Sequence, residues 1–190
     1  ALIAFQTAFL KANFALEFIA ALMTSERNNS DAVIKYIDEC RTHKIKVLPP
    51  DVNKSGALFT VSEGCIRFGL AAVKNVGEAA IESIAEIRNK ENEFDNIYDF
   101  CERVNVGKVN KKVLEALIKC GAFDSTNTRR SQMMAVLEEA LDHGSRIQKE
   151  KADSQLDLFA DSNMGTTLPE STPKLPDIEE WDDAMLLSLE

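Results

Sequence analysis

Residues 70–84 read Leu-Ala-Ala-Val-Lys-Asn-Val-Gly-Glu-Ala-Ala-Ile-Glu-Ser-Ile, and this stretch decides the fold. Apolar residues recur mostly three positions apart on both sides of residues 74–77, which predicts two short helices joined by a turn. Val76 is expected to be the buried anchor of that turn. Gly77 is expected to provide a backbone conformation that a side chain would block. The pattern predicts a helical hairpin.

The second helix of this hairpin is expected to start at Glu78. Its first backbone amides have no partner inside the helix, and together with the helix dipole they make a site for a phosphate. Such contacts follow the nucleic-acid backbone and ignore base sequence. An ordinary helical hairpin with a glycine turn fits the segment equally well, and the acidic Glu78 counts slightly against phosphate. The candidate DNA-binding residues of this turn are Lys74, Asn75, Val76, Gly77, Glu78 and Ala79.

A second candidate unit lies about 45 residues further along the chain, where an amphipathic helix is expected over residues 110–119. Lysines precede and open that helix, a glycine turn ends it, and two arginines begin the following helix. Two such units suggest a paired grip on one duplex, although for any single basic residue a solvated face is the simpler explanation. The candidate DNA-binding residues here are Lys108, Lys111, Lys112, Gly121, Ala122, Arg129 and Arg130.

An isolated apolar peptide stands out in the polar, acidic C-terminal stretch. Leu158 and Phe159 in a flexible segment would expose apolar surface, which favours a partner that buries them. Packing back onto the helices is the alternative. The candidate partner-binding residues are Gln155, Leu156, Asp157, Leu158 and Phe159.

The charge distribution leaves nucleic-acid binding open, although the net charge is −9. Residues 1–151 carry 21 basic and 21 acidic groups, so the whole imbalance lies in residues 152–190. A neutral body can still present a local basic face. The apolar stretches near the N-terminus are interrupted by polar residues, so no membrane span is expected. The four cysteines and two histidines lack the spacing of a metal site and suit a reducing cytoplasm.

The rest of the pattern predicts a mainly α fold of short helices with a small β-hairpin, a tandem helix-hairpin-helix and a largely irregular acidic tail. Helices are expected over residues 1–27 with a break at Asn13, and from Ser30 or Asn29 to about residue 43. A strand at residues 45–48, and strands 57–61 and 65–68 around a three-residue turn, make the β part. Further helices are expected over residues 70–74, 78–88, 96–103, 110–119 and 128–150.

Several of these segments together resemble the alpha subunit of bacterial DNA polymerase III. Residues 5–22 and 47–55 are both similar to the end of that family's fingers domain. Residues 67–78 and 109–124 are similar to its two helix-hairpin-helix units, and residues 155–159 fall where it carries a peptide for the sliding clamp. The resemblance covers nearly the whole chain in the same order, and it identifies the chain as a fragment of a longer protein.

The resemblance implies four parts: fingers helices at 1–44, a β connection at 45–68, a tandem helix-hairpin-helix domain at 69–151 and an acidic linker with the clamp peptide at 152–190. The implied partners are duplex DNA, the sliding clamp (the beta subunit) and the remaining polymerase domains, in the cytoplasm. The family's catalytic aspartates and Mg²⁺ belong to another domain, so no catalytic residue, metal or cofactor is expected here. A helical protein-interaction module that does not contact DNA is the alternative function.

Overall fold

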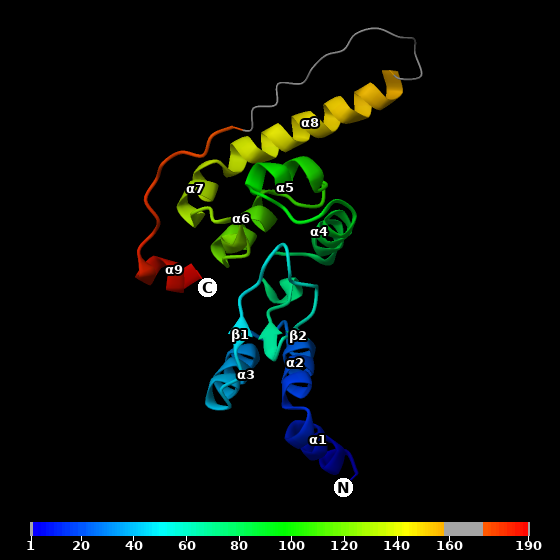
Figure 1. Cartoon of the computed structure of the whole chain (residues 1–190), viewed down its shortest axis with the longest axis vertical. Helices are drawn as coiled ribbons and strands as arrows, with labels where there is room; N and C mark the ends of the chain where they lie inside the picture. Colours follow the sequence, from blue (N-terminus) through cyan, green and yellow to red (C-terminus); the bar gives the residue numbers. More distant parts are fainter. Residues whose placement is uncertain (1, 158–172, 190) are drawn as a thin grey trace.

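The computed structural model describes residues 2–157 and 173–189, with the backbone alone for residues 154–157. As the sequence predicts, the fold is mainly helical with one small sheet. Figure 1 shows two halves: an N-terminal group of helices with the sheet, and a larger helical half capped by one long helix. No helix in the described part is long and apolar enough to cross a membrane.

The N-terminal half begins with α1 (Leu2–Asn13), α2 (Ala15–Ser25) and α3 (Ser30–Thr42). The chain breaks at Phe14, whose non-helical ψ of 52° separates α1 from α2 one residue after the predicted break at Asn13. The side chain of Asn29 caps α3 by accepting a hydrogen bond from the amide of Ala32, which confirms that boundary. The predicted apolar face of α3 is only partly buried, because Ile34 is exposed to solvent.

The sheet contains β1 (Val47–Leu48), β2 (Thr60–Ser62) and β3 (Cys65–Arg67), with β3 in the centre. β3 pairs antiparallel with β2 and parallel with β1. The predicted hairpin is present, but Ser62 pairs with Cys65, so its turn has two residues rather than three. Glu63 and Gly64 both have positive φ, as a tight two-residue hairpin turn requires. The first hairpin strand starts at Thr60 and not at residue 57.

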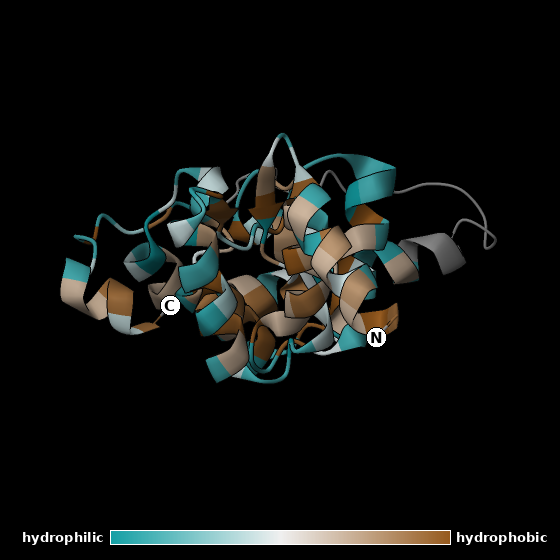
Figure 2. Cartoon of the chain, turned by 90° about the horizontal axis from the view of Figure 1, so that it is seen from below, coloured by the Kyte–Doolittle hydropathy of each residue, from teal (hydrophilic) through white to brown (hydrophobic). Residues whose placement is uncertain are grey.

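The two halves have separate cores. The smaller core packs α2 and α3 against the sheet through Ile19, Met23, Cys40 and Ile66, all about 1% exposed or less. Figure 2, seen from the N-terminal end, shows apolar (brown) and polar (teal) residues mixed along the helical ribbons. Burial raises the pKa of the Cys40 thiol, with a smaller effect from the nearby Glu39, so this cysteine behaves as an apolar core residue.

The larger half is a succession of short helices. It contains the 3₁₀ helices Leu70–Ala72 and Asp124–Thr126, and the α-helices α4 (Glu78–Glu91), α5 (Ile97–Arg103), α6 (Lys111–Lys119), α7 (Arg130–Ala135), α8 (Leu137–Asp157) and α9 (Asp183–Leu189). The single helix predicted over residues 128–150 is wrong, because the chain turns at Val136 between α7 and α8. α8 also continues past residue 152, where an irregular tail is predicted.

The core of the larger half contains a cluster of aromatic side chains. Phe100 makes edge-on contacts with Phe94 and Phe123, at ring-centroid distances of 4.9 and 5.0 Å. α8 packs closely on α5, because a Cβ at Gly144 would lie 2.3 Å from the carbonyl oxygen of Cys101. Gln148 reaches over the end of α5 and donates to its last carbonyl groups. Through this packing α8 holds α5, α6 and α7 together from one side (Figure 1).

Candidate nucleic-acid interface

The first hairpin consists of the 3₁₀ helix Leu70–Ala72, the turn at residues 73–77 and α4. Its first helix is a single 3₁₀ turn, shorter than the predicted helix over residues 70–74. Val76 is 8% exposed and anchors the turn as expected. Asn75 is the residue with left-handed backbone, at φ 67°, because the short polar side chain of asparagine tolerates that conformation.

The predicted backbone role of Gly77 is wrong. Gly77 has φ −81° and ψ 159°, an extended conformation that any residue can adopt. A Cβ built on Gly77 would meet no atom within 4 Å. The absent side chain therefore leaves open space in front of α4, and it does not relieve strain in the turn.

The N-terminus of α4 presents backbone donors to that open space. The amides of Gly77, Glu78 and Ala79 donate to no group in the described part of the chain. All three residues are exposed, as is Lys74, which forms no ion pair among the described residues. Free amides at the positive end of a helix dipole, beside a free ammonium group, are suited to an anion.

Arg27 is a cationic neighbour that sequence reasoning missed. It lies just after α2, and its Nη2 is 4.0 Å from a carboxylate oxygen of Glu78. The Glu78 side chain is 84% exposed, so the pair is a surface contact. Arg27 reduces the objection that Glu78 raises to an anion at this turn. No local pattern links the two residues, because the contact depends on how the two halves meet.

The second unit pairs α6 with α7 across the Gly121 turn, as the sequence predicts. The construction of the first turn is repeated in the loop at residues 104–110, between α5 and α6. Val109, 2% exposed, anchors the loop immediately before the helix cap, as Val76 does in the first hairpin. The side chain of Asn110 caps α6 by accepting from the amide of Val113. The loop also contacts α4, where the amide of Asn105 donates to the buried hydroxyl of Ser83 at 3.4 Å.

The lysines predicted for the second unit gather around the start of α6. Lys108, Lys111 and Lys112 are all exposed. The amides of Asn110, Lys111 and Lys112 have no acceptor within the described residues. Lys111 forms an ion pair with Glu138 of α8, whereas Lys112 has no ion pair in the described part. This helix start therefore repeats the free donors of α4, with more positive charge around them.

The Gly121 turn, residues 120–130, has a structural role instead. Gly121 has φ 76° and ends α6 as predicted, with its amide bonded to Ile118 O and the next amide to Leu117 O. Ala122 is fully buried, and its carbonyl accepts from the amide of Val52 at 2.8 Å. Gly121 and Ala122 thus have no free amide and no exposed surface for DNA. The structure therefore excludes both residues from the proposed interface.

Arg130 is likewise part of the core. Its side chain is 8% exposed, and two of its nitrogens donate to the carboxylate of Asp124 at 2.7 and 3.0 Å. A third donates to the carbonyl of Lys119 at 3.1 Å. A Cβ at Gly121 would lie 2.2 Å from this guanidinium, so the glycine makes room for it. Arg130 is therefore also removed from the proposed interface.

The C-terminal segment docks beside Arg130. The carboxylate of Glu180 accepts from the amides of Arg130 (2.7 Å), Ser131 (3.0 Å) and Trp181 (3.0 Å). Partial burial alone would raise the pKa of Glu180, but these amides outweigh it and hold the pKa below its ordinary value. Arg129 donates to Asp177 and to the carbonyl of Ile178. An anionic group of the chain itself thus occupies the start of α7.

The apolar peptide predicted to bind a partner lies at the edge of the described chain. The backbone of Gln155, Leu156 and Asp157 forms the end of α8. Leu158 and Phe159 lie outside the described residues. The peptide therefore remains a prediction from its sequence.

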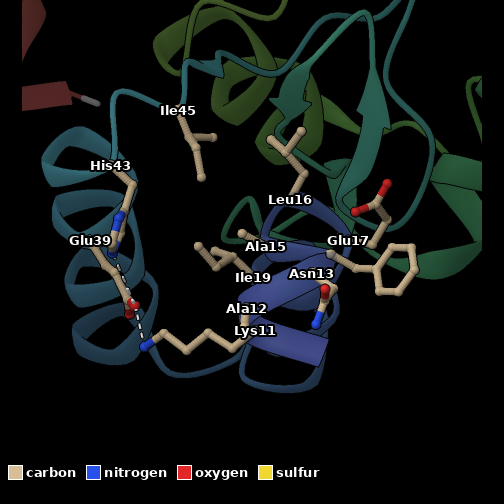
Figure 3. A pocket seen from close by; sticks show the side chains of 11 residues that line it. Lys11, Ala12, Asn13, Ala15, Leu16, Glu17, Ile19, Glu39, His43 and Ile45 are labelled. Carbon is tan, nitrogen blue, oxygen red and sulfur yellow. Dashed lines mark ion pairs between the residues drawn. The ribbon is translucent and has the colours of Figure 1, made fainter. Parts of the chain in front are cut away.

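A hollow of about 680 Å³ lies away from both hairpins, between the α1–α2 junction and α3. Figure 3 shows Lys11 reaching across it to Glu39, an ion pair of 2.5 Å that joins the end of α1 to α3. His43 lies on the other side of the same carboxylate, at 4.0 Å. The described residues contain no cluster of histidine, cysteine or carboxylate groups suited to a metal ion. The charged residues of the hollow therefore form a structural ion pair that holds α1 to α3.

Comparisons with known proteins match both the hairpins and the whole chain. A family model described as a helix-hairpin-helix motif matches residues 44–133. The chain is 40% identical over its full length to the DNA polymerase III subunit alpha of Mycobacterium tuberculosis (strain H37Rv), and it spans 16% of that protein. It is 39% identical to the Vibrio cholerae protein of the same name over 98% of the chain, again 16% of the relative. The Neisseria meningitidis protein is 45% identical over 75% of the chain and 13% of the relative.

Proposed function

Because the chain belongs to the DNA polymerase III alpha subunit family, we propose that it is a segment that binds duplex DNA without sequence preference. The observation that carries the proposal is the pair of helix starts, at α4 and α6, whose exposed amides are free and lie beside lysines. Both belong to the region matched by the helix-hairpin-helix model. Backbone amides and lysines recognise phosphate and sugar groups, so binding would follow the duplex backbone.

Salt dependence of binding tests this proposal. Two phosphate sites with their lysines would contact about four phosphates, which predicts a slope of about −3 to −4 for log affinity against log salt. Fluorescence anisotropy of labelled duplexes with unrelated sequences should give the same slope for each. No binding at low salt, or binding that does not change with salt, would contradict the proposal.

A protein-interaction module that does not contact DNA is the second candidate function. It is favoured by α1, which has no buried residue and exposes Leu2, Ile3 and Phe5 at 70, 76 and 68%. Such a face is typical of a contact with another protein surface. A protein contact through α1 is by itself compatible with DNA binding at the hairpins, because α1 is on the opposite half from them (Figure 1). Absence of DNA binding would leave the interaction module as the function.

We also propose that residues 155–159 dock onto the sliding clamp, the beta subunit. The support is chemical: two apolar side chains, Leu158 and Phe159, follow a helix end in an acidic stretch and would be buried in an apolar pocket. Replacing both with alanine should abolish clamp binding in surface plasmon resonance and leave duplex binding unchanged. Clamp binding that survives the double replacement would exclude this peptide as the anchor.

Within this proposal the chain supports processive DNA synthesis and performs no chemistry of its own. The DNA-directed DNA polymerase reaction, with its Mg²⁺ ions, would belong to the parts of the relatives that this chain does not span. The remaining domains of the alpha subunit would then be the partners of the α1 face. The chain would act in the cytoplasm with the rest of the replication machinery.

A further inference from the structure

Residues 51–55 form a small loop that closes on itself. The amide of Ser55 donates to the carbonyl of Asp51 at 2.8 Å, and the amide of Asp51 donates back to the Ser55 hydroxyl at 3.0 Å. The amide of Asn53 donates to the Asp51 carboxylate at 2.8 Å. Asp51, Val52 and Ser55 are 8, 0 and 1% exposed. Such a closed and buried loop is rigid on its own account.

One side of the loop holds the end of α4. Arg88, in the last turn of that helix, donates to the carbonyl groups of Val52 (3.2 Å) and Ser55 (2.8 Å). Asn53 pairs with the backbone of Phe94, just after α4, by accepting from its amide at 2.7 Å and donating to its carbonyl at 3.0 Å. Both contacts lie at the end of α4 opposite to its phosphate site.

The other side of the loop holds the end of α6. The amide of Val52 donates to the carbonyl of Ala122, which lies just after that helix, at 2.8 Å. The hydroxyl of Ser125 donates to the Asp51 carboxylate at 3.1 Å. These contacts again lie opposite to the phosphate site, which is at the start of α6. The same closed loop therefore binds the C-terminal ends of both phosphate-presenting helices.

We propose that residues 51–55 are a bracket that sets the spacing of the two phosphate sites, and that Asn53 is its positioning residue. The inference rests on the proposed DNA binding. Helices are rigid rods, so fixing their far ends to one loop fixes the direction in which their N-termini point. A rod that tilts at the bracket moves its N-terminal amides by ångströms, whereas a phosphate contact tolerates only tenths of an ångström. The two sites then meet phosphates of one duplex together.

A double-mutant cycle on the full chain tests the bracket. Asn53→Ala removes both bonds to Phe94 and touches neither phosphate site, whereas Lys112→Ala weakens the second site directly. Lys112→Ala should lower duplex affinity about fivefold in the otherwise wild-type chain and less than about twofold in the Asn53→Ala background, because a displaced second site no longer contacts phosphate. Duplex affinity is measured by anisotropy, and folding by circular dichroism melts.

Asn96→Ala is the matched control. Asn96 caps α5 in the same core by accepting from the amides of Tyr98 and Asp99, so its loss lowers stability without touching the bracket. The effect of Lys112→Ala should remain about fivefold in that background. Ser125→Ala replaces Asn53→Ala if the latter does not fold. An unchanged fivefold effect in the bracket variants overturns the bracket alone, whereas a wild-type chain that does not bind duplex overturns the proposed function and the bracket together.

Discussion

The first hairpin and the Gly121 turn share the same sequence features and use them in opposite ways. Each has a glycine shortly after a helix, with basic residues close by. Gly77 is in extended backbone with empty space around it, whereas Gly121 has φ 76° and lies against the Arg130 guanidinium. The cation of the first turn is exposed, and that of the second is buried against Asp124. A glycine beside cations thus marks either an open helix start or a packed turn, and the backbone angle and the room for a Cβ distinguish the two.

The largest expected effect is on the free energy of unfolding, and it distinguishes the two glycines. Gly121→Val places a branched side chain at positive φ and against the Arg130–Asp124 pair, so it should lower the free energy of unfolding by about 3 kcal/mol or more. The same substitution at Gly77 should change it by less than about 1 kcal/mol, since valine is only a poorer helix cap there. Urea denaturation followed by circular dichroism gives both values. Equal losses at the two glycines would contradict the distinction.

A smaller effect concerns the anion already present at α7. Glu180→Gln keeps the shape but loses the charge of the group that accepts three amides, and it should weaken docking of the C-terminal segment by about 1 kcal/mol. Because the pKa of Glu180 is lowered in the docked state, its contribution is complete above the ordinary value of 4.5 and is lost as the pH falls through the lowered pKa.

Trp181 reports that docking directly, since it adjoins Glu180 and is the single tryptophan of the chain. Its fluorescence in the wild-type chain should change as the pH falls below about 4.5, and the Glu180→Gln variant should lack this transition. Asp177→Asn is the control, because that carboxylate is almost fully exposed beside Arg129. A transition that persists in Glu180→Gln would assign the change to another group.

The smallest expected effect separates free from paired lysines. Lys74 forms no ion pair among the described residues, whereas Lys111 is paired with Glu138. Lys74→Ala should lower duplex affinity about threefold and reduce the salt slope by about one, and Lys111→Ala should do less because Glu138 already offsets its charge. Anisotropy titrations at several salt concentrations measure both. A larger effect at Lys111 would place the DNA closer to α6 than to the first turn.

Local features were predicted well because local interactions determine them. The break before α2, the Asn29 cap of α3 and the glycine stop of α6 each depend on a few neighbouring residues. The mainly α class with one hairpin follows from the apolar periodicity, and the family match confirms the resemblance. The Val76 anchor follows from the same periodicity.

The missed features depend on residues far apart in the chain. The partner of Arg130 at the start of α7 is Glu180, about 50 residues away, and Arg27 meets Glu78 across the two halves. The role of Gly77 was misjudged because sequence identifies a glycine but gives neither its φ nor its neighbours. The Gly121 turn was given a DNA-binding role because it carries the stronger turn signal, whereas the free helix start follows Asn110, a cap without glycine. The local sequence shows which residue types are present, but the packing of distant segments decides which of their charges and amides remain exposed and unpaired.

The central claim is that the open space at Gly77 receives a phosphate, and a charged cap tests it most directly. Gly77→Asp and Gly77→Asn both add a good N-cap of the same shape and should raise stability by a few tenths of a kcal/mol at most. Only the aspartate places a negative charge among the free amides. Duplex titration at low salt should show an affinity loss of about tenfold or more for Gly77→Asp relative to Gly77→Asn. Equal affinities of the two folded variants would contradict the claim that DNA phosphate binds at the start of α4.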